Sequence, residues 1–380
     1  MKILRILPTS DPSTGGVIES VLQMSKEIEG FGHSVEIVCL DNSDSDWIIK
    51  SPIRINALGP SRLNYRYCPR LKEWLFNNHQ RFDQFIIDGL WQYHSVAAAS
   101  VLRKCNRKYF VFPHGMLDPW FKKAYPLKHL KKMLYWPFSD YKVLRDAKAV
   151  LFTTDDEKIL ARQSFSLYKC EEKVIPIGTK GFVGDRESSI EKFYEKFPHL
   201  KDKKFFLFLG RIHPKKGIDI LLESFCALRD SLNDTCLVIA GPGPAEFINS
   251  LSKIPQKYGM SNRVYWAGML SGDIKWGAFH SSDVFILPSH QENFGMVVAE
   301  SLSCNKPVLI SNKINIWREI AEYGAGFVGE DNVDGCIGTL KRWEKLTSEE
   351  KSEMGKNAGY CFKQNFEINV AVNKFLKFIE

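Results

Sequence analysis

The sequence predicts an α/β protein made of two parallel sheets in tandem. Short apolar, β-branched runs alternate with amphipathic helical stretches along the whole chain, which is typical of parallel α/β layers. This alternation starts a second time near residue 205, after a polar and charged stretch at 179–203. The chain has 380 residues. That length is large for one hydrophobic core and favours two domains of roughly 150 to 200 residues each.

The predicted strands are short apolar runs separated by helical stretches. In the first series they are Ile3–Leu7, Val35–Leu40, Arg54–Leu58, Phe85–Asp88, Tyr109–Phe112, Ala149–Thr153 and Lys173–Ile177. The clearest helices between them are Gly16–Glu29, Tyr93–Lys104 and Leu127–Leu144. The strands of the second series are Phe205–Leu209, Cys236–Ala240, Arg263–Trp266, Val284–Leu287, Pro307–Ile310 and Gly326–Val328. Helical periodicity resumes at 332–344, 347–358 and 366–379.

Two domains and a connector follow from this pattern. We expect a first domain over residues 1–180, a second over 200–360, and a connector or short helical linker at 179–203. Open parallel sheets bind ligands beyond the carboxyl ends of their strands, so the loops that follow the strands are the candidate sites. Tandem sheets of this kind suggest a ligand cleft between the domains.

Composition excludes several classes of protein. The chain is 44% hydrophobic and 25% charged, without an apolar run long enough to cross a bilayer. Fibrous, disordered, collagen-like and integral-membrane classes are therefore excluded. Nine cysteines without a C-x-x-C pair indicate reduced thiols, with no zinc site and no disulfide frame. The segment MKILRILPTSDP lacks the features of a signal peptide, so we expect a cytoplasmic protein.

Positive charge is concentrated in the first half of the chain. The net charge is +8, and residues 103–148 alone hold 12 basic and 3 acidic side chains, 12 − 3 = +9. This excess should face something anionic, and no nucleic-acid-binding motif accompanies it. Its densest part is WFKKAYPLKHLKKMLYW, with Lys122, Lys123, Lys128, Lys131 and Lys132.

The leucines of this segment allow two interpretations. Leu127, Leu130 and Leu134 form one helical stripe. Such a basic amphipathic helix can lie on an anionic membrane surface. The stripe can also pack on the sheet beneath it, which is the commoner arrangement. We expect a core-packed helix whose lysines face a membrane or a lipid-diphosphate acceptor.

Two loops contain glycines of the kind that phosphate-binding motifs use. Gly15 and Gly16 precede a predicted helix after the first strand, where backbone N–H groups can approach an anion. A flexible helix start is an equally good interpretation. The GPGPAE stretch at 241–246 lacks the third glycine of G-x-G-x-x-G, and G-x-x-x-x-G-K-[ST] is absent from the chain. Neither the dinucleotide fingerprint nor the P-loop is therefore present.

The segment FFLFLGRIHPKKGIDILLESF opens the second series. Arg211 and Lys216 flank a turn between a buried strand and a helix. Both cations can converge at the edge of the sheet, where a pair of phosphates would bind. Alternatively, these basic side chains are simply solvated in a surface loop. Their position after the first strand of the domain favours a phosphate-binding site.

The segment VFILPSHQENFGMVVAESLSCNKPVLIS carries two glutamates around a predicted helix start near Gly295. Glu292 lies in the turn, and Glu300 lies on an apolar helix face, where burial without a partner would be costly. We therefore expect a polar ligand or backbone group beside Glu300. Backbone N–H groups at 294–296 should be available to hydroxyls or phosphate. Alternatively, Glu292 is a helix N-terminal acid and Glu300 a surface acid.

Together these segments resemble a known family. GRIHPKKG followed by SHQENFGMVVAE, with a GG loop after the first strand, closely resembles the family-4 retaining nucleotide-sugar glycosyltransferases of the GT-B fold. PHGMLDPW at 113–120, FTTDDEK at 152–158 and GPGP at 241–244 extend the likeness to nearly the whole chain. The resemblance implies two Rossmann-like domains facing an interdomain cleft. It also implies a last helix, about 362–380, that returns to the first, acceptor-binding domain.

The resemblance implies roles for individual residues. Arg211 and Lys216 would hold the donor diphosphate in place of a metal, and the sequence has no Asp-x-Asp motif. Glu292 would bind the donor sugar, Glu300 the ribose, and His114 would lie near the transferred sugar with a proton-transfer role not expected. The other implied donor-binding residues are Gly15, Gly16, Gly241, Pro242, Asn293, Phe294, Gly295, Met296 and Val297.

The implied function is that of a metal-independent, retaining hexosyltransferase. It would move a sugar from a nucleotide sugar, with UDP- or GDP-sugar expected, to a glycan or lipid-linked acceptor in polysaccharide biosynthesis. The implied location is the cytoplasm, at the inner face of the membrane. Two alternatives stay open: a nucleotide-sugar epimerase or phosphorylase on a related fold, and a catalytically silent membrane-associated assembly partner. Neither the donor sugar nor the acceptor follows from these residues.

Overall fold

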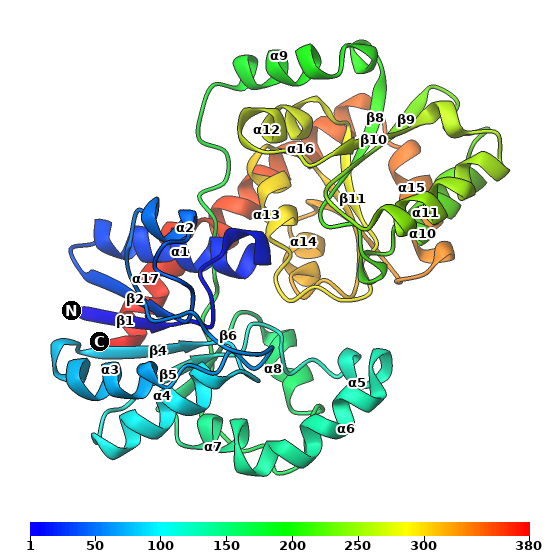
Figure 1. Cartoon of the computed structure of the whole chain (residues 1–380). Helices are drawn as coiled ribbons and strands as arrows, with labels where there is room; N and C mark the ends of the chain where they lie inside the picture. The colour runs from blue at the N-terminus through cyan, green and yellow to red at the C-terminus, as the bar shows by residue number, and fades with distance from the viewer. The chain divides into compact units, whose positions relative to one another are not determined.

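The computed structural model describes residues 1–380 and divides them into two compact units. Unit 1 comprises Met1–Gly178 together with Ile368–Glu380, and unit 2 comprises Thr179–Glu367. Each unit is built on one parallel sheet with helices packed against it (Figure 1). The prediction of two parallel α/β layers is therefore confirmed.

The sheet of unit 1 has seven strands in the order β3-β2-β1-β4-β5-β6-β7. All neighbours are parallel, and the direction of strand succession reverses between β1 and β4. A ligand of such a sheet binds beside this reversal, at the carboxyl edge. The strands are β1 Lys2–Ile6, β2 Ser34–Cys39, β3 Arg54–Ala57, β4 Gln84–Asp88, β5 Phe110–Phe112, β6 Ala149–Phe152 and β7 Glu172–Val174.

The helices of unit 1 differ from the prediction in one place. The predicted helix Leu127–Leu144 is interrupted by a 3₁₀ turn at Trp136–Phe138, because Pro137 lacks a backbone N–H and cannot continue a helix. Two shorter helices, α6 and α7, stand in its place. The helices are α1 Gly16–Gly30, α2 Asp46–Ile49, α3 Arg70–Asn78, α4 Tyr93–Lys104, α5 Trp120–Ala124, α6 Pro126–Tyr135, α7 Asp140–Arg145, α8 Asp155–Ala161 and α17 Ile368–Ile379.

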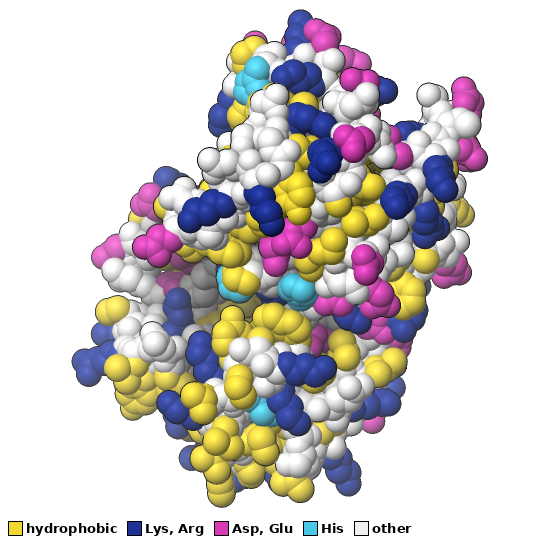
Figure 2. All heavy atoms as spheres, turned by 90° about the vertical axis from the view of Figure 1, so that its right-hand side faces the viewer, with side chains coloured by type: hydrophobic (Ala, Val, Ile, Leu, Met, Phe, Trp, Pro, Cys, Tyr) yellow, Lys and Arg dark blue, Asp and Glu magenta, His cyan; other side chains and the backbone are white.

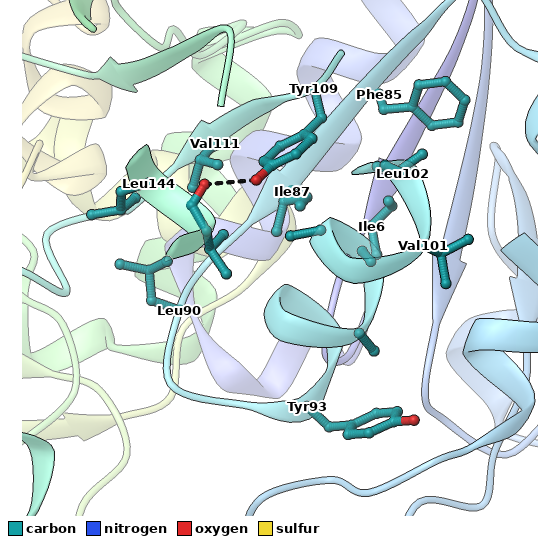
Figure 3. Packing of buried hydrophobic residues seen from close by; sticks show 14 of the residues in the cluster. Ile6, Phe85, Ile87, Leu90, Tyr93, Val101, Leu102, Tyr109, Val111 and Leu144 are labelled. Atoms are coloured by element: carbon teal, nitrogen blue, oxygen red, sulfur yellow. Dashed lines mark hydrogen bonds between the residues drawn. The ribbon is translucent and has the colours of Figure 1, made fainter. Parts of the chain in front are cut away.

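The core of unit 1 lies between the sheet and its helices. Figure 3 shows Ile6, Ile87 and Val111 from three strands near Leu102 of α4. In this view the Tyr109 hydroxyl donates a hydrogen bond of 2.9 Å to the carbonyl of Val143. A buried hydroxyl with a partner does not destabilise the core.

The C-terminal helix α17 belongs to unit 1. Phe375 and Phe378 pack against Phe112 and Phe110, and the Gln84 side chain donates to the carbonyl of Ile379 at 2.8 Å. The change of unit occurs at Ile368, later than the expected residue 362. Residues 362–366 form a π-type turn that stays with unit 2.

The sheet of unit 2 has six parallel strands in the order β10-β9-β8-β11-β12-β13. The strands are β8 Lys204–Leu209, β9 Thr235–Ala240, β10 Val264–Gly268, β11 Val284–Leu287, β12 Val308–Ser311 and β13 Gly326–Gly329. The helices are α9 Arg186–Lys196, α10 Ile218–Ala227, α11 Ala245–Lys257, α12 Gly272–Ser281, α13 Met296–Ser303, α14 Trp317–Glu322, α15 Val333–Glu344 and α16 Ser348–Cys361.

The stretch expected as a connector at 179–203 is part of unit 2. Its helix α9 packs along α12, and Phe193 is fully buried against Phe205 of β8. The two helices can approach closely because Gly277 has no Cβ. A Cβ at this position would lie 2.0 Å from the Ser189 carbonyl oxygen. The polar composition of the stretch concealed this packing, which depends on one phenylalanine and one glycine.

The nine cysteines are all free thiols. None of the helices has both the length and the hydropathy that a membrane crossing requires.

Candidate functional site

The loops after β8 and β9 lie together at the carboxyl edge of unit 2. The Gly210 N–H donates to the Ala240 carbonyl at 2.9 Å, and the Ile212 N–H donates to the Pro242 carbonyl at 2.8 Å. A Cβ on Gly241 would lie 1.8 Å from the Gly210 carbonyl oxygen. Gly241 and Pro242 therefore shape the loop that carries Arg211.

The loop after β8 also contacts the loop after β11. Gly217 has a φ of +64°, and a Cβ there would lie 2.2 Å from the Pro288 carbonyl oxygen. The His290 N–H and the Ser289 hydroxyl both donate to the Lys215 carbonyl, at 2.8 and 2.9 Å. Because β8 and β11 flank the reversal of strand order, these contacts build the edge where such a sheet binds ligands.

Three cationic side chains line this edge. The Lys216 ammonium lies 2.7 Å from Oε1 of Glu292, and that of Lys215 lies 3.9 Å from the same oxygen. Arg211 is exposed, and no carboxylate pairs with its guanidinium. Burial lowers the pKa of the neighbouring His213, and the charges of Arg211 and the two lysines lower it further. The potential of this loop is therefore positive and suits an anion.

Glu292 is held between the loops after β11 and β12. Its N–H donates to the Lys313 carbonyl at 2.9 Å, and its carbonyl accepts from the Asn315 N–H at 3.1 Å. Burial raises the pKa of the Glu292 carboxyl, but the charges of Lys216 and Lys215 outweigh burial and lower it. Glu292 is therefore an ionised hydrogen-bond acceptor.

The helix α13 begins where the sequence predicts. Gly295 is its N-cap in the left-handed region, with φ +75°, and the first turn contains no acidic residue, so the alternative of Glu292 as a helix N-terminal acid is not the one observed. The first N–H groups of a helix have no intrahelical acceptor, and here they belong to Met296 and Val297. Phe294 is buried against Phe366, and its neighbour Asn293 is partly buried.

Glu300 has a partner that sequence reasoning missed. Its carboxylate is buried, and Oε1 accepts from the Lys275 ammonium of α12 at 2.9 Å. The expected need for a polar partner was right in its physics. Within the chain a polar partner is the Lys275 ammonium, and a ligand beside Glu300 stays a prediction. Nothing in the local sequence relates α12 to α13, so only the fold could reveal this pair.

At the carboxyl edge of unit 1, His114 is buried beside a charged pair. Its Nε2 lies 2.8 Å from Oδ1 of Asp88, and its ring stacks on Phe112. Arg5 donates to both oxygens of Asp88, at 2.9 and 2.6 Å. Burial raises the pKa of Asp88, but the charge of Arg5 and the bond from His114 prevail and hold it at about 2.

The ionised Asp88 fixes what His114 can do. Because a carboxylate only accepts, Nε2 carries the proton and donates to it. In the neutral ring Nδ1 is then an acceptor, and this buried nitrogen has no partner within the protein. In that neutral form, His114 offers a single lone pair for a substrate hydroxyl. Arg5 and Asp88 were not predicted, because each stands inside an ordinary apolar strand pattern.

The motif segments of unit 1 are joined by Glu157. One oxygen of this buried carboxylate accepts from the Gly115 N–H at 2.6 Å. The other accepts from the backbone and the hydroxyl of Thr153, at 2.7 and 2.8 Å. PHGMLDPW and FTTDDEK thus form one rigid element that positions His114.

The glycine pair stands at the start of α1. Gly15 is the N-cap with φ +118°, and Gly16 is the first residue of the helix. Asp41 fixes the loop before them, because its carboxylate accepts from the Thr9 hydroxyl and the Ser10 N–H, both at 2.7 Å. Since β1, β4 and β5 are consecutive in the sheet, the glycines and His114 share one edge of unit 1.

The predicted acceptor lysines lie on α5 and α6. Lys122, Lys123, Lys128 and Lys131 are exposed, and Lys132 is partly buried. The expectation that the α6 leucines pack in the core is wrong. Leu127, Leu130 and Leu134 are exposed, and His129 is the buried residue of this helix.

Comparison with known proteins identifies both units. The model of "Glycosyl transferases group 1" matches residues 189–360, and that of "Glycosyl transferase 4-like domain" matches residues 15–178. Mannosylfructose-phosphate synthase of Agrobacterium fabrum is 23% identical over 357 residues, which are 86% of this chain and 77% of that protein. The uncharacterized glycosyltransferase MJ1607 of Methanocaldococcus jannaschii is 28% identical over 174 residues. That match spans 45% of this chain and less than half, 40%, of the relative.

A solved structure has the same fold. Anabaena HepE in complex with UDP superposes with a TM-score of 0.80 at 17% identity, covering 100% of this chain and 99% of that one. The two family models together span most of unit 1 and nearly all of unit 2. The chain therefore belongs to the group 1 glycosyltransferases, enzymes of the GT-B fold.

Proposed function

We propose that this chain transfers a hexosyl group from a nucleoside-diphosphate sugar to a glycan or lipid-linked acceptor. The observation that carries the proposal is Arg211, a guanidinium without a carboxylate partner beside Lys216 at the carboxyl edge of unit 2. Two cations at one edge of the sheet match the charge of a diphosphate. The complexes of HepE with UDP and UDP-glucose support a nucleotide-sugar donor, and we expect a UDP- or GDP-sugar.

The remaining residues of unit 2 suit the other parts of such a donor. Glu292 is ionised and can accept from two sugar hydroxyls, while the N–H groups at the start of α13 can donate to them. Glu300 would bind the ribose hydroxyls from the next turns of the same helix. In unit 1, Nδ1 of His114 would accept from a hydroxyl of the transferred sugar.

The proposed reaction retains the anomeric configuration. The bond from the anomeric carbon to the phosphate oxygen breaks, and the acceptor oxygen forms the new bond on the same face. The departing diphosphate takes the proton of the acceptor hydroxyl. Arg211 and Lys216 stabilise the charge on this phosphate in place of a metal, which is the principal catalytic contribution of the protein. Product anomers assigned by NMR test retention, since inversion would contradict this path.

A panel of UDP-, GDP- and ADP-sugars tests the donor assignment by thermal stabilisation in the presence of a chelator. One clear responder is expected, since binding to the native state raises the melting temperature. A response that requires a divalent cation would contradict the metal-independent path. No response from any donor, with or without acceptor, would favour the silent assembly partner.

The free thiols agree with the proposed cytoplasmic location.

A further inference from the structure

The polar side of helix α6 packs against the rest of unit 1, and its apolar side faces outward. Leu127, Leu130 and Leu134 recur at helical spacing, so they share one stripe. Their exposed fractions are 77%, 55% and 73%, whereas an amphipathic helix ordinarily buries this stripe. The apolar surface continues beyond the helix to Phe138, which is 76% exposed.

The inner face of α6 is held by specific contacts. His129 stacks on Phe165 with ring centroids 4.7 Å apart. The Lys132 ammonium lies over the Trp91 ring at 4.2 Å, and burial lowers its pKa to about 8. A cavity of about 60 Å³ behind the helix is lined by these polar groups and by Asp118. The outward direction of the leucines is therefore set by packing on the opposite face.

The surface around the leucines is positive. Residues 119–139 contain five lysines and no aspartate or glutamate. The nearest carboxylates in sequence, Asp118 and Asp140, are both buried. Figure 2 looks onto the side of unit 1 that carries α5 and α6, and hydrophobic side chains lie there at the surface beside Lys and Arg. This surface, residues 120–138, is named the α6 face.

We propose that the α6 face docks on an anionic lipid bilayer, with its leucines in the interfacial region and its lysines against the lipid phosphates. An apolar stripe flanked by lysines is the surface that such a bilayer complements in both hydrophobicity and charge. A second copy of the chain fits it less well, because a symmetric dimer would bring two sets of these lysines together. The inference concerns unit 1 alone and does not depend on the proposed sugar transfer.

Sedimentation of the full chain with vesicles tests the docking. Binding to phosphatidylcholine vesicles that contain phosphatidylglycerol is expected at low salt, with a loss at high salt as the lysines are screened. Serine at Leu127, Leu130 and Leu134 together should lower the partition at least about tenfold. The matched control is Ile49→Ser in α2, because Ile49 is 70% exposed and α2 lies towards the other edge of the sheet.

The charge requirement has its own pair of variants. Lys131→Gln should weaken binding about fivefold, which corresponds to one lysine near the membrane surface. Lys26→Gln, an exposed lysine of α1, should leave it unchanged. Equal binding to vesicles of phosphatidylcholine alone, or undiminished binding of the triple serine variant, would overturn the proposal. If the chain does not bind vesicles but forms a dimer, and the triple serine variant abolishes that dimer, the α6 face binds a second copy of the chain.

Discussion

The buried cluster of Arg5, Asp88 and His114 supports a quantitative prediction. Asp88→Asn removes one charge of an ion pair in which Arg5 and Asp88 are both almost completely buried. Breaking such a pair costs about 3–5 kcal/mol, because the remaining charge stays buried without compensation. The pKa gives the same order of magnitude, since a decrease from 3.8 to about 2 corresponds to about 2 kcal/mol at neutral pH.

The pH dependence of this contribution has a definite sign. The pKa of Asp88 is lower in the folded state than in the unfolded state. The stabilisation is therefore complete above the unfolded pKa of 3.8 and is lost as the pH falls towards about 2. Other carboxylates titrate in the same range, so the difference between the wild type and Asp88→Asn isolates this group. That difference should shrink between pH 4 and pH 2.

A double-mutant cycle with Arg5→Met provides the assay. Unfolding of a two-unit chain need not be two-state, so amide hydrogen exchange of β1 and β4 should report the opening of unit 1 by itself. The double variant should cost less than the sum of the single variants by at least about 2 kcal/mol. Additive costs within about 0.5 kcal/mol would refute the interpretation of the cluster as one coupled unit.

Two further predictions concern unit 2 and its loops. Arg211→Ala and Lys216→Ala should each lower kcat/KM by about 10²–10³-fold, as loss of a preorganised donor to a developing charge does. His114→Ala should cost less, and turnover equal to wild type in the two cation variants would refute the phosphate assignment. Gly217→Ala should destabilise unit 2 by about 3 kcal/mol or more in urea unfolding, because a positive φ and a backbone clash combine. The control is Gly272→Ala, which has a positive φ but open space around the new Cβ and should cost about 1 kcal/mol. Equal costs of the Gly217 and Gly272 variants would contradict the contact between the loops after β8 and β11.

The strands and the loops at their carboxyl ends could be predicted from the sequence. Buried parallel strands have continuous apolar runs, and motifs such as GRIHPKKG and SHQENFG follow them directly. The pairing of Lys216 with Glu292 joins two of these motifs, and the sequence indicates both as candidate site residues. Local patterns were sufficient wherever the functional residue lies next to the strand that positions it.

Residues whose partners are distant in sequence could not be predicted. Lys275 meets Glu300 only because α12 and α13 are neighbours in unit 2, and Arg5 meets Asp88 across adjacent strands. The leucine stripe of α6 shows a second limit, because periodicity identifies an apolar face but not the direction in which it points. There, a buried histidine and a partly buried lysine on the opposite face decide the orientation.

The central claim is that the carboxyl edge of unit 2 binds a nucleoside diphosphate through Arg211 and Lys216 without a metal ion. Titration calorimetry with UDP, GDP and ADP in the presence of a chelator tests it most directly. One diphosphate should bind the wild type, its monophosphate should bind far more weakly, and Arg211→Ala should abolish the difference. Equal binding of mono- and diphosphate, or binding that appears only with a divalent cation, would contradict the account.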